Sequence, residues 1–482
     1  MKCFIKLIRK HFMNLTKFSY SSILILIAVV FISCKKNDIQ LRFVVISDIH
    51  AGAYRSHENL PRTLKCLLQK EPLPDAVFVV GDLTNNGWPQ EYDELLETFS
   101  DSSIVPKDVA VYFMTGNHEF RDIIRNSETY PDMTVCDSTF GHDVRIESVT
   151  PIERYKEKIR QPLNQYIEIK GYPFITISMT DGDNLHGTMP DQEVRNNLYN
   201  DEALKFLSEK MQDASQNYPE KPIFLFSHLG SSCTCFGTFP QDGGGQNQFS
   251  SILDNYPQTV FFNGHSHFPI GDPRTIHQAK YTSINSGSAA FPSGEIYYIP
   301  NPLIPQNRYP EVTEGLIVNI LSDGNVEVER WDTFRDEEIF PRWHLKPPFN
   351  SSQFLYAERD GLPGPFFKDD AQVTCFIQGN NLIIRFPKAI DNEVVNHYTI
   401  DFLNEDGDIF YSGDKFSDFY LNSQMPGVYA IQIPIGKKAF FKLPICNKIK
   451  IQVTAVDSYS NKSKPITSEP VAIPSVFLRE SL

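Results

Sequence analysis

Short apolar runs alternate with amphipathic stretches through the first two thirds of the chain. Runs of this length predict buried strands, and apolar residues spaced three or four positions apart predict helices. The predicted strands cover residues 41–47, 75–80, 109–114, 174–179, 222–226 and 259–262, and the predicted helices lie around residues 60–68, 90–99, 152–165 and 201–214. Strands that alternate with helices predict a parallel, layered α/β sheet. Two further runs, joined by LSDGN at 321–325, predict a closing hairpin.

The pattern changes after residue 345. Residues 346–364 are rich in Pro and Gly, which is typical of a linker. Residues 365–482 contain short alternating runs separated by polar turns, which predict a small all-β sandwich. The stretch IQVTAVDSYSNKS resembles a fibronectin type III module, although Phe386 stands in the place of its usual Trp and Ile449 in that of its corner Tyr. Such a module is typically a spacer or a docking surface.

The first 33 residues have the pattern of a targeting segment. Basic residues precede an apolar stretch from Ile23 to Ile32, which is shorter than the roughly 20 residues that cross a membrane. Ser33 and Cys34 follow directly, and this junction resembles the lipobox of bacterial lipoproteins. The resemblance implies that Cys34 is lipidated, that residues 34–40 form a tether, and that the exported protein faces the periplasm or the cell surface. An anchor helix retained in the mature protein is the alternative.

Composition and charge narrow the class of partner. The chain has 482 residues, with 41% hydrophobic and 22% charged, which is ordinary for a globular protein of two or three domains. The formal net charge is −14, and it becomes −19 without residues 1–33, which carry five positive and no negative charges. Neutralising phosphates requires Lys and Arg, so an acidic protein argues against nucleic acid as the usual partner. The sequence indicates no protein partner.

Polar residues that can bind metal follow five of the predicted strands. The carboxyl ends of strands in open α/β sheets form the ligand crevice, so these residues are expected to meet at one edge. Taken singly, each has another explanation, since Asp after a strand is often a turn or helix-capping residue and a lone His is often buried and hydrogen-bonded. Together they predict a metal site of mixed oxygen and nitrogen ligands, suited to Mn, Fe or Zn. They are Asp48, His50, Asp82, Asn117, His118, His228, His265 and His267.

In this order the motifs D-x-H, G-D-x-x-N, G-N-H-E, H and G-H-x-H resemble those of the calcineurin-like metallophosphoesterase superfamily, over residues 41–345. The resemblance implies a four-layer fold, a β-sandwich flanked by helices, with two divalent metal ions at the sheet edge. It also implies that Asp82 bridges the two ions and that His118 is the catalytic histidine. Purple acid phosphatases have a tyrosine ligand where this chain has Asn85, so an Fe(III)–tyrosinate site is not expected. The implied ligands are Asp48, His50, Asp82 and His267 for one ion and Asp82, Asn117, His228 and His265 for the other.

The implied activity is hydrolysis of a small-molecule phosphate mono- or diester by direct attack of water, without a phospho-enzyme. Arg121 is a candidate phosphate contact, although a solvated surface charge explains it equally well. Residues 120–170 are expected to form an insertion over the site, and the Gly-rich residues 228–249 a substrate loop. The alternatives are a non-catalytic surface-binding lipoprotein with an inert core and, less in keeping with the acidic charge, a nuclease.

Overall fold

The computed structural model describes residues 38–121, 134–137, 142–145, 149–181, 198–238, 245–293, 301–303, 311–357, 359, 361–420, 427–434 and 448–473. Cys34 lies outside the described residues. Among the helices that are described, none has the length and apolar character needed to cross a membrane.

A six-stranded mixed sheet forms around the first predicted strand. Its order is β16-β15-β14-β1-β2-β3, in which β1, β2 and β3 run parallel and β14, β15 and β16 form an antiparallel meander. The expected hairpin is β14–β15. The strands are β1 (Ile39–Ile46), β2 (Ala76–Val80), β3 (Ala110–Met114), β14 (Glu314–Leu321), β15 (Val326–Asp332) and β16 (Glu337–Leu345).

A second six-stranded mixed sheet has the order β12-β13-β11-β8-β7-β6. Its four central strands are parallel, and β6 and β12 close its two edges in antiparallel pairs. The parallel sheet expected from the sequence is therefore two mixed sheets. The strands are β6 (Gln165–Ile169), β7 (Tyr172–Thr176), β8 (Ile223–Phe226), β11 (Thr259–Asn263), β12 (Ile276–Gln278) and β13 (Thr282–Asn285).

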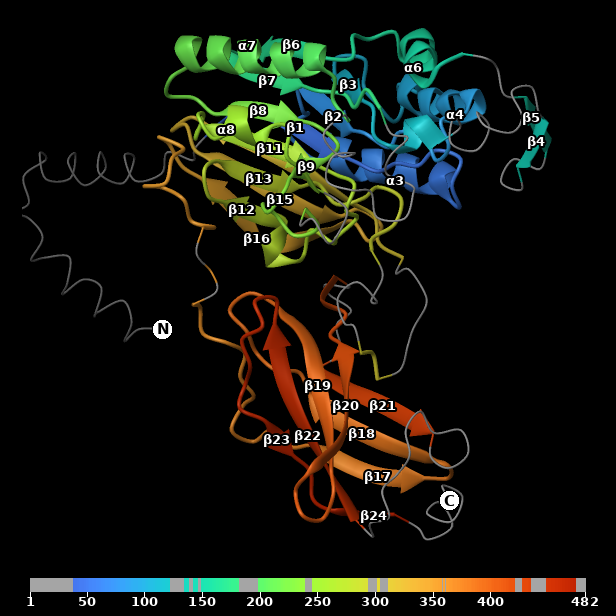
Figure 1. Cartoon of the computed structure of the whole chain (residues 1–482), viewed down its shortest axis with the longest axis vertical. Helices are drawn as coiled ribbons and strands as arrows, with labels where there is room; N and C mark the ends of the chain where they lie inside the picture. Colours follow the sequence, from blue (N-terminus) through green and yellow to red (C-terminus); the bar gives the residue numbers. More distant parts are fainter. Residues whose placement is uncertain are drawn as a thin grey trace, which may run out of the picture.

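The two sheets pack face to face around an aromatic core (Figure 1). Side chains alternate across β1, so Phe43 and Val45 point into this core while Val44 and Ile46 pack beneath helices. The Phe43 ring lies 5.0–6.0 Å from four phenylalanines of the opposite sheet and from Phe78 beside it. Helices cover the outer faces and complete four layers: α3 (Ser56–Leu68), α4 (Pro89–Ser100) and α6 (Pro151–Ile159) on the first sheet, and α7 (Asp201–Asn217) and α8 (Ser250–Leu253) on the second.

The described part of the expected insertion belongs to these layers. Helix α6 ends at Ile159 because Arg160 has a φ of 58° and Pro162 cannot continue a helix, so the predicted helix at 152–165 was too long. The next residues form β6 of the second sheet. From residue 149 onward the prediction of an insertion was wrong. Within residues 122–148, the structure describes only the backbone of the hairpin β4 (Thr134–Asp137) and β5 (His142–Arg145).

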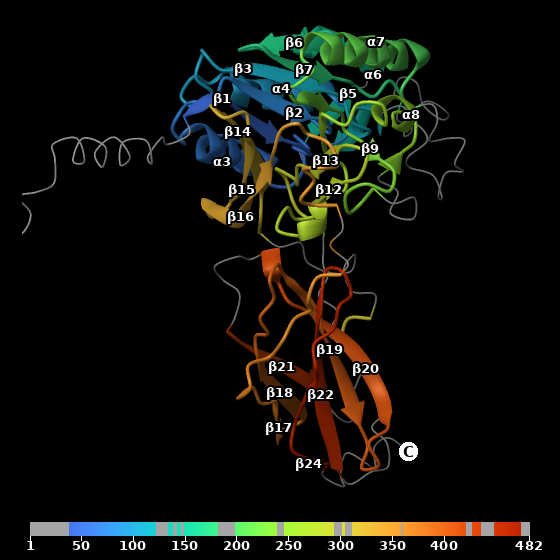
Figure 2. The ribbon, with the colours of Figure 1, turned by 90° about the vertical axis from the view of Figure 1, so that its left-hand side faces the viewer.

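The C-terminal part of the chain is all-β, as expected, and its two sheets enclose one core (Figures 1 and 2). One sheet has the order β17-β18-β21 and the other β20-β19-β22-β23, with β24 paired to β22. Phe386 is 1% exposed and packs on two tyrosines, so it fills an interior position. The relation to fibronectin type III modules and the domain boundaries stay predictions. The strands are β17 (Thr374–Gln378), β18 (Asn381–Pro387), β19 (Val395–Leu403), β20 (Ile409–Phe416), β21 (Val428–Pro434), β22 (Lys448–Asp457), β23 (Ile466–Thr467) and β24 (Val471–Ala472).

Candidate metal centre

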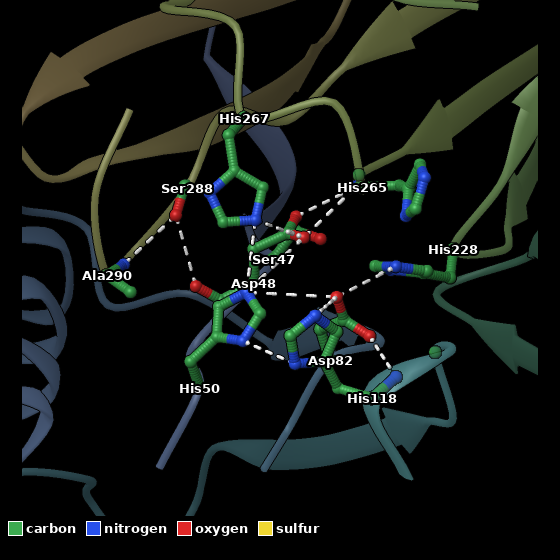
Figure 3. A network of polar contacts seen from close by, with 12 residues as sticks. Ser47, Asp48, His50, Asp82, His118, His228, His265, His267, Ser288 and Ala290 are labelled. Carbon is green, nitrogen blue, oxygen red and sulfur yellow. Dashed lines mark hydrogen bonds and ion pairs between the residues drawn. The ribbon is translucent and has the colours of Figure 1, made fainter. Parts of the chain in front are cut away.

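The predicted ligands lie together where strands from both sheets end (Figure 3). Parallel strands bring their carboxyl ends to the same edge of a sheet, so the residues that follow them become neighbours. Short strands β9 (Gly230–Ser231) and β10 (Gly245–Gln246) pair beyond one of these ends. The residues at the edge are Asp48 and His50 after β1, Asp82 after β2, Asn117 and His118 after β3, His228 after β8, and His265 and His267 after β11.

One group consists of Asp48, His50, Asp82 and His267, whose ligand atoms all lie within 4.8 Å of one another. His267 Nε2 is 3.1 Å from Asp48 Oδ1, and His50 Nε2 is 3.7 Å from Asp82 Oδ2. The Nε2 atoms of His50 and His267 lie only 3.0 Å apart. Four buried donor atoms that converge in this way, two of them on carboxylates, fit a divalent cation.

A second group consists of Asp82, His228 and His265, again within 4.8 Å. His228 Nε2 is 3.2 Å from Asp82 Oδ2. The amide oxygen of Asn117 lies 3.1 Å from His228 Nε2 and 2.8 Å from His265 Nδ1, so it joins the group. Asp82 belongs to both groups and can bridge two ions. The structure thus brings all seven predicted ligands together, and the binding of metal by them stays a prediction.

The ligand loops turn sharply at the strand ends. Asp48, His50, Asp82, His265 and His267 all have φ between 49° and 68°. This left-handed region is uncommon for residues other than glycine, although Asp and His enter it more readily than most. The sharp turns direct the ligand side chains of separate strands back toward one point.

Two glycines allow the ligand loops to approach closely. A Cβ atom at Gly116 would lie 2.3 Å from Asp82 Oδ1, and one at Gly264 would lie 1.8 Å from Ser47 Oγ. Both distances are well inside contact range, so any larger residue would displace a ligand loop. The glycines of the G-N-H-E and G-H-x-H motifs therefore have a steric role.

Hydrogen bonds to backbone carbonyls orient two of the imidazoles. The Nδ1–H of His267 donates to Phe291 O at 2.8 Å, and the Nδ1–H of His228 donates to Val80 O at 2.9 Å. Each bond directs Nε2 toward the carboxylates and leaves Nε2 as the ring nitrogen that can bind a metal once its proton is lost. The carboxylate of Asp48 is fixed in turn by the backbone N–H of His265, at 2.9 and 3.1 Å from its two oxygens.

The charges at the site favour a cation. Burial lowers the pKa of His50 to about 3 and that of His265 to about 4, so both rings are neutral ligands near pH 7. At His228 burial acts in the same direction, but Asp82 and Asp48 outweigh it and raise the pKa to about 9. The buried carboxylates thus hold a proton on His228, and a divalent cation bound by this group would displace that proton and take over its charge. The donor set and its charge fit two such cations.

His118 lies beside the first group and outside both ligand sets. Its Nδ1 is 2.9 Å from Asn85 O and 3.1 Å from His50 Nδ1, and its Nε2 is 3.8 Å from Asp82 Oδ2. Burial holds the pKa of His118 well below its usual value. The guanidinium of Arg121, half-buried, lies 3.4 Å from the same Asn85 carbonyl. The guanidinium of Arg121 and the imidazole of His118 therefore lie together at one side of the site.

Sequence reasoning assigned no role to two residues that organise the centre. Glu119 is fully buried and accepts from Thr84 N at 2.9 Å, Thr84 Oγ1 at 2.8 Å and Gly116 N at 2.6 Å, which joins the loops after β2 and β3. Burial, with Asp82 adding to it, raises the pKa of Glu119 to about 7. Its place in G-N-H-E was a usable signal. Phe291 comes 24 residues after His267, and nothing local marks its carbonyl as a partner.

Residues 41–269 match the family model of calcineurin-like phosphoesterases. This region of the chain belongs to that family. The predicted four-layer phosphoesterase core and the additional all-β C-terminal part are both confirmed. Membership in a phosphoesterase family supports hydrolase chemistry in general and leaves the substrate open.

Solved structures similar to this chain include GAP50, the anchor in the inner membrane complex of Plasmodium. It is 12% identical, with 67% of this chain and 92% of that chain covered and a TM-score of 0.40. The purple acid phosphatase PPD1 from yellow lupin (Lupinus luteus) is 14% identical, with 64% and 54% covered and a TM-score of 0.40. Similarity at this level decides nothing about function. The search of curated protein sequences found no match.

Proposed function

We propose that the protein is a metal-dependent phosphoesterase that hydrolyses a small-molecule phosphate mono- or diester with two divalent ions, of Mn, Fe or Zn. The observation that carries the proposal is Asp82, which belongs to two ligand groups at once. Divalent cations bound by these groups would supply water acidified to a pKa of about 7 and positive charge for the phosphoryl oxygens.

The chain's own residues would orient the ester and move its proton. His118 donates its Nδ1–H to Asn85 O, which leaves Nε2 facing the site. The negative charge of a bound phosphate ester would raise the pKa of this ring, so that Nε2 could take up a proton and pass it to the leaving oxygen. Arg121 lies on the same side, and its charge would stabilise a phosphate there. Direct attack of water predicts inversion of configuration at phosphorus. Retained configuration would contradict this mechanism.

The first experiment compares hydrolysis of bis(p-nitrophenyl) phosphate and p-nitrophenyl phosphate by protein that has been stripped of metal and reloaded with Mn. Asp82→Asn is expected to abolish metal-dependent turnover, because it removes a charge shared by both groups. Asp332→Asn is the matched control, since Asp332 is equally buried in the same domain and belongs to neither group. Diester preference would indicate a phosphodiesterase, and monoester preference a phosphatase.

The alternative is a non-catalytic binding lipoprotein. It would be supported if the protein bound two ions but hydrolysed neither ester, and if Asp82→Asn bound the protein's partner as well as the wild type does. A nuclease is less in keeping with the net charge of −14.

We further propose that the protein is exported and anchored to a bacterial membrane through a lipid on Cys34. The support is the apolar segment that ends at Ser33 and Cys34. Cys34→Ala is expected to release the protein from the membrane fraction and to remove acyl label, with the exposed Cys233→Ala as the control. Membrane retention of Cys34→Ala would favour the uncleaved anchor helix.

A further inference from the structure

The loop that carries His265 and His267 contacts the C-terminal sandwich, the all-β part formed by β17 to β24, before the chain enters β12. Figures 1 and 2 both show this sandwich against the end of the larger domain that holds β12 and β16. A Cβ atom at Gly271, four residues after His267, would lie 3.5 Å from the ring of Phe419 in the sandwich. Phe419 is buried in a cluster with Phe416, Tyr420 and Val312. The metal loop therefore rests on an apolar surface of the sandwich.

Arg359 fastens the same loop through polar contacts. Its side chain is 6% exposed, and its guanidinium donates to the carbonyl of Pro273, six residues after His267. The Nε–H donates to Tyr459 Oη at 2.6 Å, and Nη2 lies 3.5 Å from Glu393 Oε1. Tyr459 and Glu393 both belong to the sandwich. Because the buried guanidinium contacts both the larger domain and the sandwich, it fixes the two parts against each other.

A second segment of the chain holds His267 from its other side. Besides the bond from His267 Nδ1 to Phe291 O, Ser293 N donates to His267 O at 2.7 Å and Ser293 Oγ donates to Ser266 O at 2.7 Å. Ala290 N donates to Asp48 O at 3.1 Å. Residues 290–293 thus determine the position of both the backbone and the ring of His267.

The same segment reaches the sandwich ten residues after Ser293. Leu303 is 2% exposed and lies in the core of the sandwich, and its N–H donates to Asp414 O at 2.7 Å. Asp414 N donates to Asn301 O at 2.8 Å, so Pro302 forms an isolated parallel β-bridge with Asp414 of β20. The loop that carries His267 therefore contacts the sandwich, and the chain that follows Ser293 enters the sandwich at residues 301–303.

We propose that the C-terminal sandwich is a positioning element of the metal centre, and that it holds the His267 side of the ligand group Asp48, His50, Asp82 and His267. Weakening its contacts lowers cation affinity while both parts of the chain stay folded. The inference rests on the proposed function only in that these residues bind divalent cations, and it gives the sandwich a role beyond that of a spacer.

The test uses the full chain with Arg359→Ala and Leu303→Ala, and Leu382→Ala as the matched control. Leu382 is fully buried in the same core as Leu303, but it comes from β18 and not from the segment that leads from the metal centre. Titration calorimetry with Mn²⁺ measures affinity and stoichiometry. Amide exchange in EDTA measures the protection of Ser293 N–H without any metal.

Arg359→Ala and Leu303→Ala are expected to weaken one Mn²⁺ site about threefold to tenfold, less than the roughly 10–100-fold typical of residues that contact a ligand directly. Both should also speed the exchange of the Ser293 amide. Leu382→Ala should lower the melting temperature of the sandwich and leave Mn²⁺ affinity within about twofold. Arg359→Lys, which retains the charge, should recover part of the affinity.

Unchanged affinity and unchanged Ser293 exchange in the two test variants would overturn the inference, as would an equal loss in Leu382→Ala. The readouts separate this inference from the proposed function. A protein that binds two ions, loses affinity in Arg359→Ala and hydrolyses no ester would refute the phosphoesterase proposal alone. Exchange measured in EDTA tests the coupling even if Mn²⁺ is not the resident ion.

Discussion

Replacing Glu119 by Gln is expected to loosen the two loops that hold Asp82 and His118. The carboxylate accepts from three donors, two on Thr84 at one oxygen and the Gly116 N–H, 2.6 Å from the other. An amide offers one acceptor oxygen, so its NH₂ group must face at least one of these buried donors. Loss of a charge-assisted bond together with an unsatisfied buried donor costs about 2–4 kcal/mol.

Thermal unfolding at pH 8, above the pKa of about 7 for Glu119, measures this cost. A loss of about 2–4 kcal/mol corresponds to roughly 3–6 °C in melting temperature for a domain of this size. Mn²⁺ affinity should fall as well, because Gly116 packs on Asp82 and the next residue, Asn117, is a predicted ligand.

Glu91→Gln provides the matched control. Glu91 is equally buried and accepts from Asn86 N at 2.8 Å, Asn86 Nδ2 at 2.9 Å and Trp88 N at 3.1 Å, at the start of α4. Glu91→Gln should lower the melting temperature about as much as Glu119→Gln does, but it should reduce Mn²⁺ affinity less. A Glu119→Gln protein within about 0.5 kcal/mol of the wild type, or equal affinity losses in both variants, would refute this reasoning.

Three further predictions concern sterics, pH and metal removal. Gly116→Ala should abolish Mn²⁺ binding, because its Cβ would lie 2.3 Å from Asp82 Oδ1, whereas Gly361→Ala, with open space around it, should have no effect in the same titration. Burial raises the pKa of Glu314 well above its usual 4.5, so the folded protein retains this proton to higher pH than the unfolded chain does. The wild-type free energy of unfolding should therefore fall as the pH rises above about 4.5, and denaturant titrations of Glu314→Gln should show a shallower decline. Chelation should lower the melting temperature of the wild type, since a ligand at 100 times its Kd stabilises by about 2.7 kcal/mol, and a melting temperature unaffected by EDTA would argue against bound ions.

The sequence determined the elements of the core and the chemistry of its edge. Continuous apolar runs such as 43–46 and 76–80 are buried on both faces, and this is visible without any knowledge of their partners. The polar residues directly after these strands could be identified as candidate ligands, because the end of a strand is a local property that a parallel sheet converts into a shared edge.

Other features depended on contacts between residues distant in the sequence. The run around Phe43 does not indicate that β1 pairs with β14, some 270 residues later, or that a second sheet covers it. The helix expected at 152–165 ended early because β6 pairs with β7 in that second sheet. The local pattern of apolar and polar residues indicates whether a strand or helix is buried. Which strand it pairs with depends on residues elsewhere in the chain.

The support of His267 shows the same division. The G-H-x-H motif identified His267 as a candidate ligand. The role of Phe291 depends on its backbone carbonyl, and that of Leu303 on its place in the core of the sandwich. Every residue carries a carbonyl, so no side-chain pattern distinguishes the one that orients an imidazole. The sequence by itself determined which atoms can bind metal, and only the tertiary structure decided what holds them in place, because those contacts join segments that the chain brings together on folding.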